Sequence, residues 1–251
     1  MTANASLKSL ARKSGLFGLA RKVYRSISPA VRRHLSDDRA LYGKFISRGD
    51  LVFDIGCNLG QKSVTFLRLG ARVIAVEPNP NCAPVLDLEF GDEPNFTLVR
   101  KAVGTAPGAA TLNFANTHAT ASLRPDWHAL VYSDGPLQQV VVDVTTLDDL
   151  IASYGEPDFC KIDVEGFEPE VVKGLSRPLK MLSLEYHRHE PERIIGCLEI
   201  LQGLGPIRLN VIAMEGREFI CDEWKSVDDF RAMLGGADLP TVGDVFVARR
   251  I

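Results

Sequence analysis

The chain has 251 residues, which suits one large α/β domain with an appendage better than two full domains. Hydrophobic residues make up 45% of it and charged residues 24%, and the formal net charge of −3 excludes a globally basic surface, so we expect no nucleic-acid partner. The five cysteines are widely spaced and never form a CxxC pair, which argues against a disulfide framework or a structural zinc site and favours a cytoplasmic location.

Residues 1–48 are predicted to form a basic helical extension of a domain that spans residues 49–251. Up to Ser36 the chain carries eight Lys or Arg residues and no acid. Apolar residues recur at helical spacing among these charges, and Pro29 separates two predicted helices. The extension can therefore contact an anionic membrane peripherally, at its inner face, or pack on the domain with its basic side in solvent. No apolar run in it is long enough to cross a bilayer.

From Asp50 onward, short β-branched runs alternate with helical stretches, as in βαβ units. We expect strands at residues 51–55, 71–77, 96–103, 157–166 and 181–187. We expect helices at residues 60–70, 79–91, 146–155 and 191–205. This alternation predicts an α/β fold built on a mostly parallel sheet.

Two regions depart from the alternation. The β-like runs 109–115 and 137–144 enclose a polar loop between them. Near the end of the chain, the runs 207–216, 217–224 and 242–250 also read as strands and follow one another closely. We expect an antiparallel element to close the sheet there.

The turn after the first strand reads DIGCNLG, from Asp54 to Gly60. Ligands of parallel sheets bind beyond the carboxyl ends of the strands, and glycines at 56 and 60 allow a tight turn and a close ligand. Asn58 stands where a dinucleotide fingerprint has its second glycine, which argues against a pyrophosphate. The carboxylate of Asp54 instead suits a ligand with a positive group, such as S-adenosylmethionine.

A second anchor follows the next strand. Glu77 lies 23 residues beyond Asp54 and is followed by Pro78. An acid about 20 residues after such a glycine turn is placed to accept hydrogen bonds from ribose hydroxyls. An adenosine ligand is therefore indicated, although Glu77 could also serve only the start of the next helix.

The third element is KIDVEGFE, from Lys161 to Glu168. In a strand, Lys161, Asp163 and Glu165 project to one side. Three charges on one face of a buried strand are costly unless that end opens into a cleft, or unless Lys161 pairs with an acid.

Taken together, these motifs resemble the FkbM family of S-adenosylmethionine-dependent methyltransferases. The likeness rests on segments between Leu51 and His187, in this order: VFDIGCNLGQKS, AVEPNP, RKAVG, ASL, TLDDL, KIDVEGFEPEVVKGL and LEYH. The family is similar in fold to other Rossmann-like class I methyltransferases. That fold has a seven-stranded, mostly parallel sheet with an antiparallel last strand and helices on both faces.

The resemblance implies S-adenosylmethionine as the cofactor and a set of residues around it. The implied cofactor contacts are Asp54, Gly56, Asn58, Gly60, Glu77, Pro78, Ala102, Val103 and Asp163. Glu77 would hold the ribose, Ala102 and Val103 the adenine, and Asp163 the methionine end or the acceptor. Phe167 stands where the family often has a small residue, which could reshape the acceptor pocket.

Methyl transfer to an alcohol needs a group that takes the hydroxyl proton, and three strand-end residues are candidate catalytic groups: Asp163, Glu165 and His187. His187 is attractive because an unperturbed imidazole is largely neutral in the cytoplasm. The same residues do not form a recognisable ligand set, so no metal is expected. The implied acceptor is a hydroxyl of a small molecule, of a sugar or glycan, or of a secondary metabolite.

Two other classes of function stay open from the sequence. One is an oxidoreductase or epimerase that uses a nicotinamide dinucleotide. The other is a non-catalytic nucleotide-binding module recruited to membranes by the basic extension. Neither the acceptor nor the oligomeric state follows from the sequence.

Overall fold

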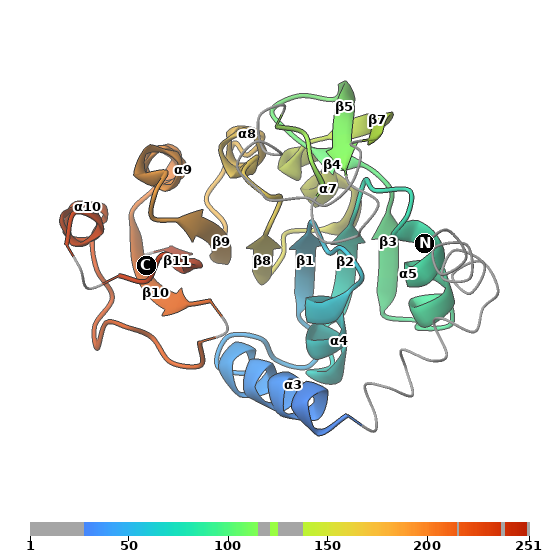
Figure 1. Cartoon of the computed structure of the whole chain (residues 1–251), viewed down its shortest axis with the longest axis horizontal. Helices are drawn as coiled ribbons and strands as arrows, with labels where there is room; N and C mark the ends of the chain where they lie inside the picture. The colour runs from blue at the N-terminus through green and yellow to red at the C-terminus, as the bar shows by residue number, and fades with distance from the viewer. Residues whose placement is uncertain (1–27, 115–120, 125–137, 215, 237–238, 250–251) are drawn as a thin grey trace, which may run out of the picture.

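The computed structural model describes residues 28–114, 121–124, 138–214, 216–236 and 239–249. Its main sheet has seven strands in the order β3-β2-β1-β8-β9-β11-β10 (Figure 1). Their bounds are Leu51–Ile55 (β1), Arg72–Val76 (β2), Phe96–Val99 (β3), Phe159–Ile162 (β8), Met181–His187 (β9), Ile207–Ala213 (β10) and Val242–Arg249 (β11). Strands β3 to β9 run parallel, whereas β11 is antiparallel to both β9 and β10. The predicted sheet with its antiparallel last strand is confirmed.

The register brings the carboxyl ends of the central strands to one level. Asp54 of β1 lies beside Ala75 of β2 and Lys161 of β8. The turns that follow these strands therefore meet at one edge of the sheet, where ligands of parallel sheets bind.

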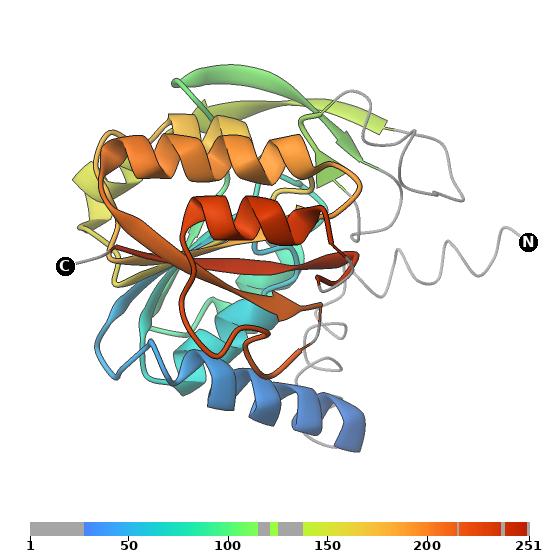
Figure 2. The same cartoon turned by 90° about the vertical axis from the view of Figure 1, so that its left-hand side faces the viewer.

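Helices cover both faces of the sheet, and each face has its own apolar core. One face carries α7 (Leu147–Tyr154), α8 (Glu168–Lys173), α9 (Pro191–Leu204) and α10 (Val227–Leu234). The other carries α3 (Pro29–Tyr42), α4 (Gln61–Arg68) and α5 (Ala83–Phe90). Figure 2 shows α9 and α10 on the opposite side of the sheet from α3.

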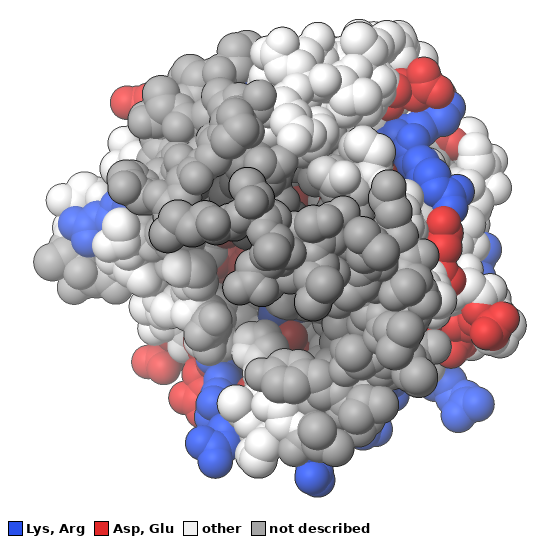
Figure 3. Space-filling model, turned by 45° about the vertical axis from the view of Figure 1, so that its right-hand side comes forward, with Lys and Arg blue, Asp and Glu red and all other residues white. Residues whose placement is uncertain are grey.

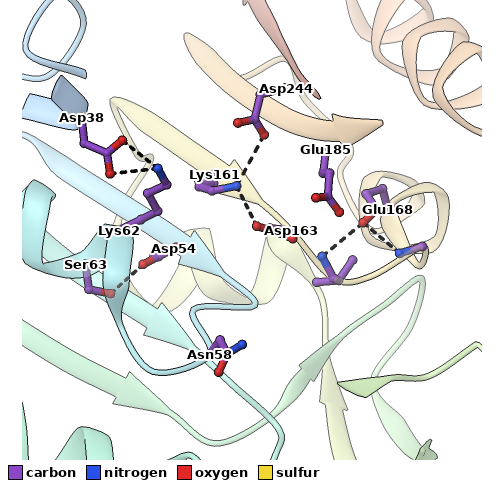
Figure 4. A network of polar contacts seen from close by, with 12 residues as sticks. Asp38, Asp54, Asn58, Lys62, Ser63, Lys161, Asp163, Glu168, Glu185 and Asp244 are labelled. Atoms are coloured by element: carbon purple, nitrogen blue, oxygen red, sulfur yellow. Dashed lines mark hydrogen bonds and ion pairs between the residues drawn. The ribbon is translucent and has the colours of Figure 1, made fainter. Parts of the chain in front are cut away.

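Helix α3 begins with Ser28 as its N-cap and Pro29 in its first turn, which suits a helix start. Its last residue, Tyr42, is 1% exposed and contacts three aromatic rings, those of Phe66, Phe159 and Phe246. Lys62 of α4 reaches back to Asp38 of α3, with its Nζ 2.8 Å from both carboxylate oxygens (Figure 4). The described part of the 1–48 extension is thus tied to the body of the domain. The helix predicted before Pro29 lies outside the described residues.

A second, smaller sheet lies above the carboxyl ends of the main strands (Figure 1). It has the order β4-β7-β5-β6, with bounds Ala102–Val103 (β4), Gln138–Thr145 (β7), Gly108–Phe114 (β5) and Ala121–Ser122 (β6). The strand predicted at 96–103 is therefore two strands in two sheets, because the chain leaves the main sheet after Val99.

Two features near the end of the chain differ from the prediction. Residues 217–224 were expected to form a strand and do not, because the Asn210 side chain bonds to both the N–H and the C=O of Cys221 in place of a strand ladder. Helix α10 was not anticipated, although Ser226 and Asp229 form a complete capping box at its start.

Within the described parts of the chain, no helix is long and apolar enough to span a bilayer.

We expect Tyr42→Ala to lower the free energy of unfolding by about 3–5 kcal/mol, because it empties a fully buried aromatic site. Val141→Ala removes a side chain that is 70% exposed and is expected to cost less than about 0.5 kcal/mol. Urea unfolding followed by circular dichroism measures both. Equal stability of the two variants would show that α3 is not integral to the domain.

Candidate active site

A pocket opens at the carboxyl ends of β1, β2 and β8, below the second sheet. The empty space there is about 670 Å³, part of which is open to solvent. The residues that line it come from the turns after three parallel strands and from the second sheet: Ile55, Gly56, Asn58, Val76, Glu77, Pro78, Lys101, Ala102, Val103, Leu112, Ala121, Ser122, Leu123, Asp163, Val164, Glu165 and Phe167.

Gly56 fixes how closely the turns after β1 and β8 approach each other. It has a φ of +77°, and a Cβ there would lie 1.8 Å from the backbone oxygen of Asp163. The Asp163 N–H donates to the Ile55 carbonyl at 3.0 Å in the same place. Any side chain at position 56 would push the two turns apart, so a glycine is required.

Glu77 joins the turns after β1 and β2. Its Oε2 accepts from the Asn58 N–H and its Oε1 from the Asn79 N–H, both at 2.8 Å. The side chain is 6% exposed, and burial raises the pKa of Glu77 to about 7, although the two backbone donors work to lower it. Each oxygen keeps a second lone pair, so the carboxylate can still accept a hydrogen bond from a ligand in the pocket.

Asp54 lies behind the pocket and is not among the described lining residues. It is 2% exposed, and its Oδ2 accepts from the Ser63 hydroxyl at 2.6 Å (Figure 4). Burial raises the pKa of Asp54 to about 6, against the Ser63 hydrogen bond, which lowers it. The carboxylate that was expected to face a ligand directly therefore contributes its charge from behind the pocket wall.

Gly60 was also expected beside the ligand and instead serves helix packing. A Cβ on it would lie 2.6 Å from the ring of Phe90, so the glycine lets α5 pack against the start of α4.

The KIDVEGFE segment leaves the strand earlier than predicted. Strand β8 ends at Ile162, and a turn follows in which Glu165 has a φ of +54° and Gly166 a φ of +90°. The expected alternation of Lys161, Asp163 and Glu165 along one strand face is therefore wrong. Asp163 and Glu165 nevertheless both line the pocket, because the turn itself points into it.

Glu168 holds this turn in place. Its Oε1 accepts from the N–H groups of Val164 and Gly166, each at 3.1 Å (Figure 4). The Ser122 hydroxyl adds a bond to the Glu165 carbonyl at 2.8 Å. These three bonds compensate for the unfavourable positive φ of Glu165, a conformation that side chains other than glycine seldom adopt.

Glu165 is the most strongly perturbed carboxyl group of the pocket lining. Burial raises the pKa of Glu165 to about 9, and the negative charges of Glu185, Asp163 and Glu168 add to the effect. At neutral pH its carboxyl group is therefore mainly protonated, so it can donate a hydrogen bond and is not suited to accept a proton.

His187, predicted as a third catalytic candidate, is not among the described lining residues. Its Nε2 lies 3.5 Å from Glu185 Oε2, and the hydrogen bond with Glu185 raises the pKa of His187. The imidazole is therefore more often protonated near neutral pH than its unperturbed pKa suggested, which makes it less suited to act as a base.

The structure thus brings together seven predicted cofactor residues, Gly56, Asn58, Glu77, Pro78, Ala102, Val103 and Asp163, with the candidate catalytic residue Glu165. It leaves Asp54, Gly60 and His187 outside the lining. Phe167, which was expected to reshape the acceptor pocket, lines it, whereas Lys101 and Leu123 line the pocket but were not predicted as site residues. The second sheet brings Ser122 and Leu123 to the pocket. Local sequence patterns do not predict how the strands of this sheet pair.

No group of three or more potential metal ligands occurs among the residues that the structure describes. On the face shown in Figure 3, the described acidic and basic side chains lie mainly around the edge, with both signs interspersed.

The sequence profile of the methyltransferase FkbM domain matches residues 54–226. This stretch contains all three turns that form the edge of the pocket, together with most of both sheets.

Individual relatives match more weakly. Hexuronic acid methyltransferase AglP from Haloferax volcanii is 28% identical over 136 residues, which cover 53% of this chain and 53% of that protein. Ribosomal RNA small subunit methyltransferase A from Clostridium perfringens is 37% identical over 57 residues, which cover 23% of this chain and 20% of that protein. The chain thus spans about half the length, or less, of these curated relatives. Among solved structures, precorrin-6y C5,15-methyltransferase from Geobacter metallireducens has a TM-score of 0.44 at 16% identity over 90% of each chain.

The protonated state of Glu165 predicts how stability depends on pH. A carboxyl group whose pKa is raised by folding stabilises the folded state fully below its unfolded pKa, and this contribution is lost as the pH rises through about 9. Wild type should lose on the order of 2 kcal/mol between about pH 7 and pH 10 through this group. Glu165→Gln, which stays neutral, should lose correspondingly less in denaturant unfolding over that range. Parallel curves for the two proteins would contradict the assignment.

Proposed function

The chain belongs to the methyltransferase FkbM family, and from this premise we propose that it transfers a methyl group to a hydroxyl oxygen of a sugar or glycan. As a member of this family it is an S-adenosylmethionine-dependent methyltransferase. The observation that carries the proposal is the edge of the pocket. There Glu77 follows β2, and Asp163 and Glu165 lie in the turn after β8, on the other side of β1.

The residues present fit S-adenosylmethionine. Glu77 offers carboxylate lone pairs beside the turns after β1 and β2, as a ribose with two adjacent hydroxyls requires. Ala102 and Val103 give an apolar wall on one side for a flat base. On the other side Asp163, with Asp54 behind it, favours a positively charged group. When bound, the cofactor supplies an electrophilic methyl group, and the chain has to hold the acceptor oxygen in line with it.

Two carboxyl groups with different surroundings lie at the acceptor side. The Lys161 ammonium, 2.9 Å from Asp163 Oδ2, compensates the negative charge of that carboxylate. Glu165 is protonated at neutral pH and can donate a hydrogen bond. Such a pair can divide the work on a hydroxyl group, with Asp163 accepting the proton and Glu165 orienting the acceptor. His187, outside the lining, is not assigned a role in this step.

The relative AglP supports a sugar as acceptor, since its name describes a hexuronic acid methyltransferase. A hydroxyl of a secondary metabolite is the alternative acceptor in the same mechanism. The basic N-terminal extension allows contact with membranes, where lipid-linked glycans are found, and this peripheral contact is part of the proposal.

Glu77 predicts a pH dependence of cofactor binding. The ribose hydroxyls need the ionised carboxylate, and with the pKa of Glu77 at about 7 the affinity for S-adenosylhomocysteine should fall about tenfold from about pH 8 to pH 6. Glu77→Gln should bind weakly at both pH values. Asp54→Asn, which alters another buried carboxyl group, should retain the fall. Calorimetric titration measures the affinity of all three proteins. If the affinity of wild type does not change between these pH values, the assignment to Glu77 is wrong.

The acceptor is tested with methyl-labelled S-adenosylmethionine and separate pools of lipid-linked glycans, free sugars, hydroxylated metabolites and ribosomal RNA. We expect label in a sugar hydroxyl, located by mass spectrometry of the product. Asp163→Asn should lower the rate by about 10²–10⁴-fold, as the loss of a general base does. Label only in RNA or in non-sugar metabolites would overturn the sugar proposal without affecting the cofactor assignment.

A further inference from the structure

Lys161 places a positive charge in the middle of the main sheet. Its side chain comes from β8, with Asp54 of β1 and Ser183 of β9 as its register neighbours. The residue is 3% exposed. A buried ammonium is costly unless carboxylates surround it, so this lysine requires an explanation.

Two carboxylates share the ammonium. The Lys161 Nζ lies 2.9 Å from Asp163 Oδ2 and 3.5 Å from Asp244 Oδ1 (Figure 4). Burial works to lower the pKa of Lys161, but Asp163 and Asp244 outweigh it and raise that pKa well above its ordinary value. The lysine is therefore charged at neutral pH.

The two partners differ in where they lie. Asp163 lines the pocket, whereas Asp244 belongs to β11 and is not among the described lining residues. Lys161 itself does not belong to that lining either. Of its two partners, only Asp163 can therefore carry an effect of the ammonium to a bound ligand by direct contact.

The backbone of Asp163 is already fixed by its hydrogen bond to Ile55 and by the close contact with Gly56. Its side chain is not fixed by the backbone, since the carboxylate can rotate about two bonds. The ion pair with Lys161 restricts this rotation and compensates the charge from the side facing away from the pocket.

We propose that Lys161 is a positioning residue for methyl transfer, which holds the Asp163 carboxylate in one orientation at the pocket wall. This role concerns the S-adenosylmethionine end of the pocket and does not depend on which acceptor the enzyme uses.

The proposal is tested by a double-mutant cycle of wild type, Lys161→Met, Asp163→Asn and the double variant. Calorimetric titration with S-adenosylhomocysteine gives the affinity of each protein without any acceptor. We expect Lys161→Met to weaken binding about tenfold when Asp163 is present and by less than about twofold in the Asp163→Asn background. An equal loss in both backgrounds, or no loss in either, would overturn the proposal.

Lys161→Arg adds a readout that a purely structural role does not change. Arginine keeps a positive charge beside Asp163, so this variant should recover most of the affinity that Lys161→Met loses. An equal loss of affinity in the two variants would contradict the assignment to the charge of Lys161.

Asp244→Asn is the matched control, because it removes the other partner of Lys161. It should leave the affinity within about twofold of wild type. If it reproduces the loss seen in Lys161→Met, the lysine serves β11 and not the pocket. Because Lys161→Met leaves two carboxylates unpaired and can prevent folding, the cycle is also run in the Asp244→Asn background, with thermal unfolding measured for every variant.

Discussion

The pocket depends on the contact between two turns at Gly56 and Asp163. A Cβ at position 56 would lie 1.8 Å from the Asp163 oxygen, so the missing side chain lets the ends of β1 and β8 meet. This contact places the acidic turn next to the strand that carries the first glycine motif. The remaining geometry follows from it: Glu77 joins the next turn, and Glu168 holds the far side of the acidic turn.

Around this contact the protein concentrates carboxyl groups. The surroundings of these groups differ, and the surroundings decide what each group can do chemically. Glu77 accepts two backbone N–H bonds, Asp163 pairs with Lys161, and Glu165, which lies near three other acids, stays protonated. A site for a cationic cofactor needs negative charge that is neither fully neutralised inside the protein nor lost to protonation. The proposed function uses this difference, with Asp163 facing the positive group and Glu165 as a hydrogen-bond donor.

The sheet was predictable because β-branched runs ending in glycine turns leave a strong local pattern, and Glu77 was predictable from its distance to that turn. The positions of Asp54 and His187 were not, because strand-end residues point either into a pocket or behind it, and the spacing alone does not decide which. The turn at Glu165 escaped prediction because a positive φ there is stabilised by Glu168 and Ser122, which come from other elements. Long-range contacts of this kind have no local signature in the sequence.

The place of β11 has a consequence for how the chain folds. Although it is the last strand in sequence, it lies between β9 and β10 and supplies Phe246 to the ring cluster around Tyr42 near the other end of the chain. The sheet cannot close until residues 242–249 have been synthesised, so until then one edge of β9 and the edge of β10 that faces it have no strand partner. Contacts between such distant parts of a chain form late and slow the folding reaction. Because of this strand order, the pairing of residues 242–249 is the step that completes the main sheet.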